Sequence, residues 1–119
     1  MVDTMTDTNF EVKQGADWNG KVILKDDNGT VINLTGYTAK MQLRLYKDKK
    51  SNLFDTLSTD NGRITITPTA GQLDFKIPSS VSDNYTFDKA YYDLEITDST
   101  GIITRVLEGI ITINKNVTN

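Results

Sequence analysis

The segment Tyr37–Tyr46, which reads YTAKMQLRLY, decides the fold class of this chain. Apolar and polar side chains alternate along it: one face carries Tyr37, Ala39, Met41, Leu43 and Leu45, and the other carries Thr38, Lys40, Gln42 and Arg44. A period of two sustained over such a length is typical of a β-strand with one buried and one solvated face. We therefore predict that this segment forms a strand that covers one side of a hydrophobic core.

Shorter alternating segments lie on both sides of it, and turn residues separate them. The clearest turn is Asp26-Asp27-Asn28-Gly29, because an Asn-Gly pair tolerates the positive φ of a tight hairpin. The other predicted strands cover residues 10–13, 21–25, 31–34, 53–57, 63–67, 72–77, 92–97 and 102–115. In the last of these, Gly109 predicts a bulge or kink through which one strand serves both sheets.

One helical turn is predicted after Pro78. Ser79 or Ser80 is the expected cap, and Val81 and Tyr85, four residues apart, are expected to point inward. No other segment has a helical pattern, so the chain offers no crossover helix for a parallel sheet.

The composition agrees with an all-β protein. Among 119 residues there are 17 Thr, 11 Ile and 7 Val, against only 4 Ala and 3 Glu. Branching at Cβ favours strands, whereas Ala and Glu favour helices. We predict an antiparallel β-sandwich of about 7–9 strands with at most one short helical turn. Residues 10–115 are the expected domain, 1–9 a flexible arm or lead-in strand, and 116–119 a tail.

Composition and charge also argue against several classes of function. The chain has no Cys and no His, so it lacks thiol chemistry, thiolate zinc sites and the commonest general base. A net charge of −3 and a pI near 4.8 argue against nucleic-acid binding. No apolar run is long enough for a membrane helix, and no signal peptide opens the sequence. We expect synthesis in the cytoplasm, without membrane insertion.

No catalytic, cofactor-binding or metal-binding residue is predicted. Most Asp residues fall in turns, where solvated carboxylates are ordinary, rather than as a pair flanking a scissile bond. The segment Asp26–Gly29 lacks the alternating ligands of a calcium loop, and Ser79 and Ser80 have no base beside them. We therefore expect a protein that is not an enzyme and carries no cofactor.

Three aromatic residues, Trp18, Tyr46 and Tyr91, are the candidate partner contacts. Together with Phe54 they could form an exposed platform for a sugar or a protein. Trp18 lies in a predicted loop, Gln14–Gly20, so the alternative is that it closes one end of the sandwich. Arg44 is expected to pair with Asp93 or Glu95 across the sheet if their strands are neighbours.

The segment Asp88–Leu94 matches the Asp-x-Ala-x-Tyr-x-apolar spacing at the start of the F strand of immunoglobulin-like domains. Leu94 would take the place of the disulfide cysteine of antibody domains, and Tyr92 is a candidate tyrosine corner. The lone Trp is early in the chain rather than in the third strand, so an antibody-type core is not implied.

A longer succession of motifs resembles small immunoglobulin-like β-sandwich proteins from the structural gene clusters of tailed bacteriophages and prophages. It is similar to the N-terminal domains of baseplate upper proteins over roughly residues 10–118. The motifs are Gly15-x-x-Trp18, Asp27-Asn28-Gly29, Leu34-Thr35-Gly36-Tyr37, Met41-Gln42-Leu43-Arg44, Asn61-Gly62-x-Ile64, Tyr92-Asp93-Leu94-Glu95, Gly101, Arg105 and Gly109.

The resemblance implies a virion component of the tail, baseplate, neck or head decoration, with no active site to carry over. The expected partners are other virion proteins, and the expected state is a symmetric homo-oligomer in the particle. A carbohydrate-binding or adhesin module is the alternative, and it depends on Trp18 and the tyrosines.

Overall fold

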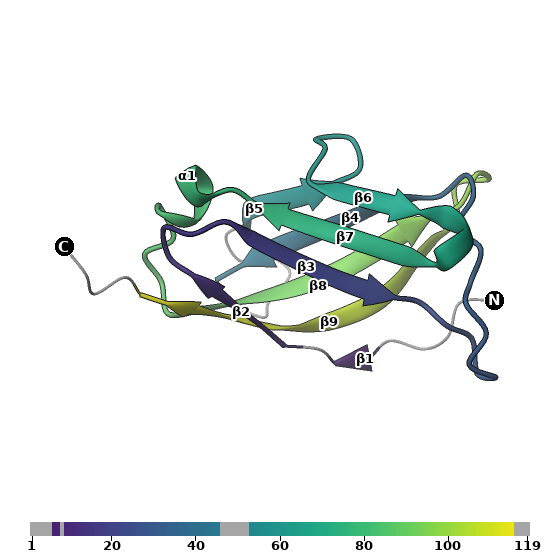
Figure 1. Ribbon diagram of the computed structural model, residues 1–119, viewed down its shortest axis with the longest axis horizontal. Coiled ribbons are helices and arrows are strands. Elements are labelled where there is room, and N and C mark those ends of the chain that lie inside the picture. The colour runs from purple at the N-terminus through teal and green to yellow at the C-terminus, as the bar shows by residue number, and fades with distance from the viewer. Residues whose placement is uncertain (1–5, 8, 46–52, 116–119) are drawn as a thin grey trace.

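The strands of the protein form two sheets that face each other across a hydrophobic core (Figure 1). The computed structural model describes residues 6–7, 9–45 and 53–115. In these residues the elements are β1 Thr6–Asp7, β2 Phe10–Lys13, β3 Trp18–Ile23, β4 Thr38–Arg44, β5 Leu53–Ser58, β6 Ile64–Thr67, the 3₁₀ turn Pro68–Ala70, β7 Gln72–Ile77, α1 Ser79–Ser82, β8 Lys89–Thr97 and β9 Ile103–Asn114.

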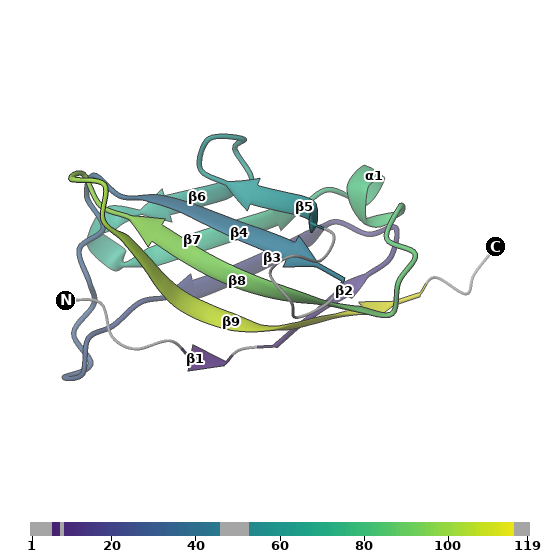
Figure 2. The ribbon, with the colours of Figure 1, turned by 180° about the vertical axis from the view of Figure 1, so that it is seen from behind.

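Sheet A has the strand order β1-β9-β8-β4-β5, with β2 also paired to β9, and sheet B has the order β3-β7-β6. Figure 2 shows β4, β8 and β9 of sheet A in front of β3, β6 and β7 of sheet B. Five pairs of strands are antiparallel: β3–β7 and β6–β7 in sheet B, and β4–β5, β4–β8 and β8–β9 in sheet A. Strands β1 and β2 instead run parallel to β9. The predicted all-β sandwich is confirmed, and the two parallel pairs are an addition to the predicted antiparallel arrangement.

Strand β4 confirms the alternation from which the fold was predicted. Ala39, Met41 and Leu43 are at most 4% exposed, and they face the core. Thr38 and Lys40 point to solvent on the opposite face. Because β4 lies between β8 and β5, its inward side chains contribute to the centre of the core.

Strands β7 and β8 also contribute a large share of the core. Leu73, Phe75 and Ile77 of β7 are buried, as their alternation predicted. Ala90, Tyr92, Leu94 and Ile96 form the buried face of β8, so the segment that resembles an F strand is a central strand with Leu94 fully buried. Alternating inward residues on two facing sheets are what builds the core of a sandwich.

The irregularity in β9 is at Val106, and the prediction of a bulge at Gly109 was wrong. Leu94 pairs with Leu107 while Glu95 pairs with Arg105, so Val106 is an extra residue on β9. Both Val106 and Leu107 are buried, which explains why the inward phase of this strand was ambiguous in the sequence. Gly109 pairs regularly with Tyr92, and β9 pairs only within sheet A.

Two boundaries near the start of the chain also differ from the prediction. Trp18 is the first residue of β3 rather than part of a loop, because its backbone pairs with Ile77. The predicted strand at 31–34 is reduced to one bridge between Lys25 and Val31.

The predicted helical turn is present as α1, but its cap comes from elsewhere in the chain. The Asp17 carboxylate accepts a hydrogen bond of 2.6 Å from the backbone N–H of Ser79, and no side chain of the turn caps it. Val81 packs partly buried against the core and Tyr85 is buried, as predicted.

Within residues 1–9, the structure describes Thr6–Asp7, which pairs with Leu107 and Glu108 of β9, and Asn9. The Asn9 side-chain oxygen accepts a 2.9 Å hydrogen bond from the backbone N–H of Ile110. This part of the range forms a lead-in strand beside the domain. The remaining residues of the predicted arm, and the predicted tail at 116–119, lie outside the described residues.

Candidate functional site

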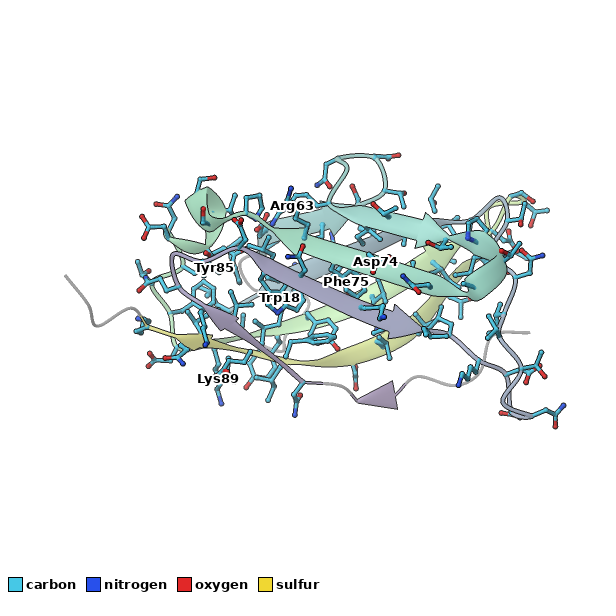
Figure 3. All side chains as sticks on the ribbon, in the orientation of Figure 1. Trp18, Arg63, Asp74, Phe75, Tyr85 and Lys89 are labelled. Carbon is cyan, nitrogen blue, oxygen red and sulfur yellow. The ribbon has the colours of Figure 1, made fainter. Side chains whose placement is uncertain are left out.

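A cluster of Asp55, Arg63 and Tyr85 joins three separate segments at one edge of the sandwich. Asp55 comes from β5, Arg63 directly precedes β6, and Tyr85 follows α1. The Arg63 guanidinium binds the carboxylate through both terminal nitrogens, at 2.8 Å to Oδ1 and 2.9 Å to Oδ2. The Tyr85 hydroxyl donates to the same Oδ2. Figure 3 shows Arg63 and Tyr85 near α1, at the same end of the molecule.

Charge and burial in this cluster stabilise one protonation state. Burial raises the pKa of Asp55, but hydrogen bonds from Arg63 and Tyr85 and the positive charge of Arg63 outweigh it, so this pKa lies below its usual value. The hydrogen bond to Asp55 raises the pKa of Arg63. Burial, followed by the bond to Asp55, raises the pKa of Tyr85 well above its usual value.

This arrangement is chemically suited to cross-linking strands rather than to catalysis. Asp55 is a fixed anion, Arg63 a fixed cation, and Tyr85 a neutral hydrogen-bond donor. A general acid or base needs a pKa near the working pH, and all three groups are shifted away from neutrality. The ring of Tyr85 also packs edge-on against Phe54, with centroids 5.6 Å apart, so both ends of this side chain are held.

Two members of the cluster, Asp55 and Arg63, close the outer edge of β5 together with Asn61. The backbone N–H of Thr56 donates to Asp55 Oδ1 at 2.8 Å, and that of Ser58 donates to Asn61 Oδ1 at 3.0 Å. Asn61 Nδ2 donates to the Thr56 carbonyl at 2.9 Å, and the Arg63 N–H donates to the Ser58 carbonyl at 3.1 Å. Side chains and the following turn thus occupy backbone groups that an added strand would need.

The sequence analysis did not find this cluster. Arg63 and Tyr85 are 8 and 30 residues from Asp55 along the chain, and only tertiary folding brings the three together. One signal was present: Asp55 interrupts the apolar segment LFDTL of a predicted strand. A carboxylate in such a position needs a partner, because burying it unpaired is costly.

Trp18, the first candidate contact, packs at the boundary between the sheets. Its indole stacks on Phe75, with ring centroids 6.4 Å apart and planes 9° apart, and meets Phe10 edge-on at 5.3 Å. The indole also covers Gly20: a Cβ at that position would lie 2.5 Å from a ring carbon. Trp18 is half-buried, and Figure 3 shows it beside Phe75. This placement corresponds to the alternative in which Trp18 closes the sandwich.

Tyr91, the second candidate, is half-exposed on the outer face of sheet A. The Lys89 ammonium lies 5.8 Å from the centre of its ring, which is within cation–π range. Arg44 of β4 is its partner in the pairing of the two strands. The third candidate, Tyr46, lies outside the described residues. Of the other two, Trp18 packs against Phe75 and Phe10 whereas Tyr91 lies on the outer face of sheet A, so these two do not form one platform.

The ion pairs of this outer face differ from the predicted ones. Strands β4 and β8 are neighbours, but Arg44 donates to Gln42 at 3.0 Å and forms no ion pair with a described residue. Arg105 of β9 takes the predicted role, with Nη2 at 3.7 Å from Asp93 and 3.8 Å from Glu95. The prediction for Arg44 was wrong: its register partner on β8 is Tyr91, two residues from Asp93, and its guanidinium bonds to Gln42 instead.

A buried hydroxyl fastens α1 to the loop before β3. Ser82 is fully buried; its hydroxyl donates to the Ala16 carbonyl at 2.8 Å and accepts from the Gly15 N–H at 3.1 Å. The serine therefore satisfies two backbone groups of the loop. These two hydrogen bonds explain why a polar side chain is buried at this position.

Two adjacent isoleucines are the most exposed large apolar side chains in the described residues. Ile102 and Ile103, at the start of β9, are 63% and 61% exposed. The hairpin before them is held by Asp98, whose Oδ1 accepts from the backbone N–H groups of Thr100 at 2.9 Å and Ile102 at 3.0 Å. The hydrogen bond from the Thr100 hydroxyl, followed by those from the backbone, lowers the pKa of Asp98.

Comparison with known proteins identifies no family for this chain. Among the described residues, no group of three or more acidic side chains is placed to hold a metal ion. In the same part of the chain, no helix has the length and apolar character needed to span a membrane. No family model matches the sequence, and no curated protein matches it significantly.

Proposed function

We propose that this protein is a non-enzymatic structural subunit of a tailed-bacteriophage particle, in the tail, baseplate, neck or head decoration, and that it acts through protein–protein contacts. It would be made in the host cytoplasm and assembled with other virion proteins. The resemblance over residues 10–118 supports the phage assignment. The Asp55–Arg63–Tyr85 cluster supports a structural role, because its charged groups are used to join strands.

The exposed pair Ile102 and Ile103 is the observation that carries the proposal of a protein contact. Each side chain is more than half exposed, and the pair begins a strand whose preceding turn is ordered by Asp98. Burying one such side chain contributes about 1.5–3 kcal/mol. Neighbouring side chains of an extended strand point to opposite faces, so a partner that covered both isoleucines would wrap this end of the sheet. Covering either side chain would gain part of this energy without reordering the hairpin.

Purified particles provide the direct test. Particles released from the source host are banded on a density gradient and analysed by quantitative mass spectrometry. The proposal requires the protein to co-purify with the particles at a fixed copy number relative to the major structural proteins. Its abundance in the lysate together with its absence from the particles would refute the proposal.

A matched pair of variants tests the contact itself. Ile102→Asp places a charge in the apolar pair, whereas Thr112→Asp places one at an exposed site on the outer face of β9. We expect Ile102→Asp to lower incorporation into particles at least tenfold and Thr112→Asp to leave it unchanged. Equal incorporation of both would remove the isoleucine pair from the interface.

The second candidate function, a carbohydrate-binding or adhesin module, is supported by Tyr91. Its half-exposed ring beside Lys89 provides an aromatic surface of the kind on which sugar rings stack. On a glycan array, binding should disappear in Tyr91→Ala and persist in Tyr91→Phe. An array without signal for the unmodified protein would argue against this function.

A further inference from the structure

The outer edges of the two sheets are protected to different degrees. On β5, side chains and the turn occupy the backbone groups of Thr56 and Ser58, as described above. On β9, the outer edge is covered by β1 and β2, and Asn9 bonds to the Ile110 N–H between them. An uncapped edge strand is a template for another strand, so the edges of sheet B are the relevant ones.

The hydrogen bonds of β6 show which of its backbone groups are open. The Lys76 N–H donates to the Arg63 carbonyl at 2.9 Å, and the register continues with Thr65 opposite Asp74. Because hydrogen-bonded and non-hydrogen-bonded pairs alternate in an antiparallel ladder, Thr65 points its N–H and C=O toward β7. The backbone N–H and C=O groups of Ile64 and Ile66 therefore point away from β7. None of the described residues forms a hydrogen bond with these groups.

From this geometry we propose that a second copy of the chain pairs with β6 in antiparallel orientation, with Thr65 on the twofold axis. This register places Ile64 opposite Ile66 of the second copy and Ile66 opposite Ile64 of the second copy. Each is then a hydrogen-bonded pair, so the outward N–H and C=O groups of both residues find partners in both chains. The two copies of sheet B would join into one continuous sheet.

The side chains are compatible with this register. Ile64 and Ile66 lie on the core side of β6, so they meet apolar side chains of the second copy on the same face. Thr65 is exposed on the other face and meets its own copy, a pair that hydrogen-bonds well across strands. Arg63 would face Thr67 of the second copy, and its charge is already neutralised by Asp55.

The opposite edge of sheet B lacks this self-complementarity. The Leu24 N–H donates to the Gly71 carbonyl, which sets the phase of β3 and leaves Asn19, Lys21 and Ile23 with outward backbone groups. A twofold pairing that used all three would place Lys21 opposite its own copy. Like charges directly opposite each other are destabilising, so the exposed Lys21 protects this edge.

This inference concerns the partner and register of β6, and it does not depend on the phage assignment or on the isoleucine pair. Failure of either proposed function would leave it standing. Conversely, a protein that fails to pair through β6 could still assemble through Ile102 and Ile103.

A cysteine at the axis gives a direct test, because the chain contains no Cys. The two Cα atoms of a non-hydrogen-bonded antiparallel pair are about 4.5 Å apart, within the disulfide range of about 4.4–6.8 Å. Under mild oxidation, Thr65→Cys should form a covalent dimer at least tenfold faster than Thr112→Cys, which places the thiol at another exposed site, on sheet A. Equal rates for the two variants would overturn the proposal.

Equilibrium sedimentation provides the second measurement. We expect the unmodified protein to dimerise, Thr65→Lys to raise the dimer Kd at least tenfold, and Thr65→Ser to leave it within about twofold. Since the Thr65 side chain is exposed, circular dichroism should show the same fold in all three proteins. A protein that remains monomeric at millimolar concentration, or a dimer that Thr65→Lys does not weaken, would overturn the proposal.

Discussion

Replacing Asp55 with Asn removes the charge from the Asp55–Arg63–Tyr85 cluster while keeping the shape of the side chain. The substitution deprives Arg63 of its bidentate anion and leaves a largely buried guanidinium without a counter-charge. Removing one partner of a fully buried ion pair costs about 3–5 kcal/mol, and a hydrogen bond to a charged group contributes about 1.5–3 kcal/mol. The side chains of Arg63 and Asp55 are 18% and 15% exposed, so water screens part of this loss.

We therefore expect Asp55→Asn to lower the free energy of unfolding by about 2–3 kcal/mol. For a domain of this size, that loss corresponds to a fall in Tm of roughly 8–12 °C. Urea denaturation followed by circular dichroism measures the change. The matched control is Asp60→Asn in the exposed turn before β6, which should stay within about 0.5 kcal/mol of the unmodified protein. A loss below 0.5 kcal/mol for Asp55→Asn would refute the structural role of the cluster.

The pH dependence gives a second measurement on the same variant. The folded-state pKa of Asp55 lies below its ordinary value of 3.8, so its contribution is fully present above that value. The contribution is lost as pH falls through the folded-state pKa, because the carboxyl is then protonated in both states. The stability difference between the unmodified protein and Asp55→Asn should therefore be constant near neutrality and shrink below about pH 4. A difference that did not change with pH would contradict the charge argument.

Three further predictions concern single residues. Because the pKa of Tyr85 is raised, the folded state should lose stability as pH rises above about 10, and Tyr85→Phe should flatten this loss in alkaline urea titrations; an unchanged slope would contradict it. Gly71→Ala should cost about 2–4 kcal/mol, since φ is +60° and a Cβ would lie 2.8 Å from the Ile32 carbonyl oxygen. Gly29→Ala, at φ +82° with open space, should cost less; equal losses in thermal melts would refute the steric reasoning. Ser82→Ala should cost about 1–3 kcal/mol by leaving two loop groups without a partner, and a loss below 0.5 kcal/mol by urea denaturation would remove that role.

The fold was predictable where its cause is local. Residues 37–46, 72–77 and 92–97 alternate because neighbouring side chains of a strand point to opposite faces, and this period is visible in the sequence. The boundary at Trp18 was missed because a glycine and an asparagine follow it, and these residues weaken a strand pattern. Their positions in β3 are set by pairing with β7, which is remote in the sequence.

The candidate site was much less predictable, because its contacts join distant segments. The period of β9 indicated that some irregularity existed, but the choice of Val106 over Gly109 depends on the register with β8. The ion pairs of Arg105 depend on the same register. Nothing in the local sequence pairs Asp55 with Arg63 and Tyr85, although a carboxylate within an apolar strand indicates that some partner is required.

The parallel pairing of β2 with β9 determines how the domain would respond to mechanical force. Phe10–Lys13 lies beside Ile111–Asn114, and both strands run in the same direction. A pull on the chain before β2 and an opposite pull on the chain after β9 would slide the two strands past each other. The hydrogen bonds between them would then be loaded together rather than broken one after another, as they would be if the strands peeled apart. A molecule connected through both ends of this pair would therefore bear tension in its strongest direction.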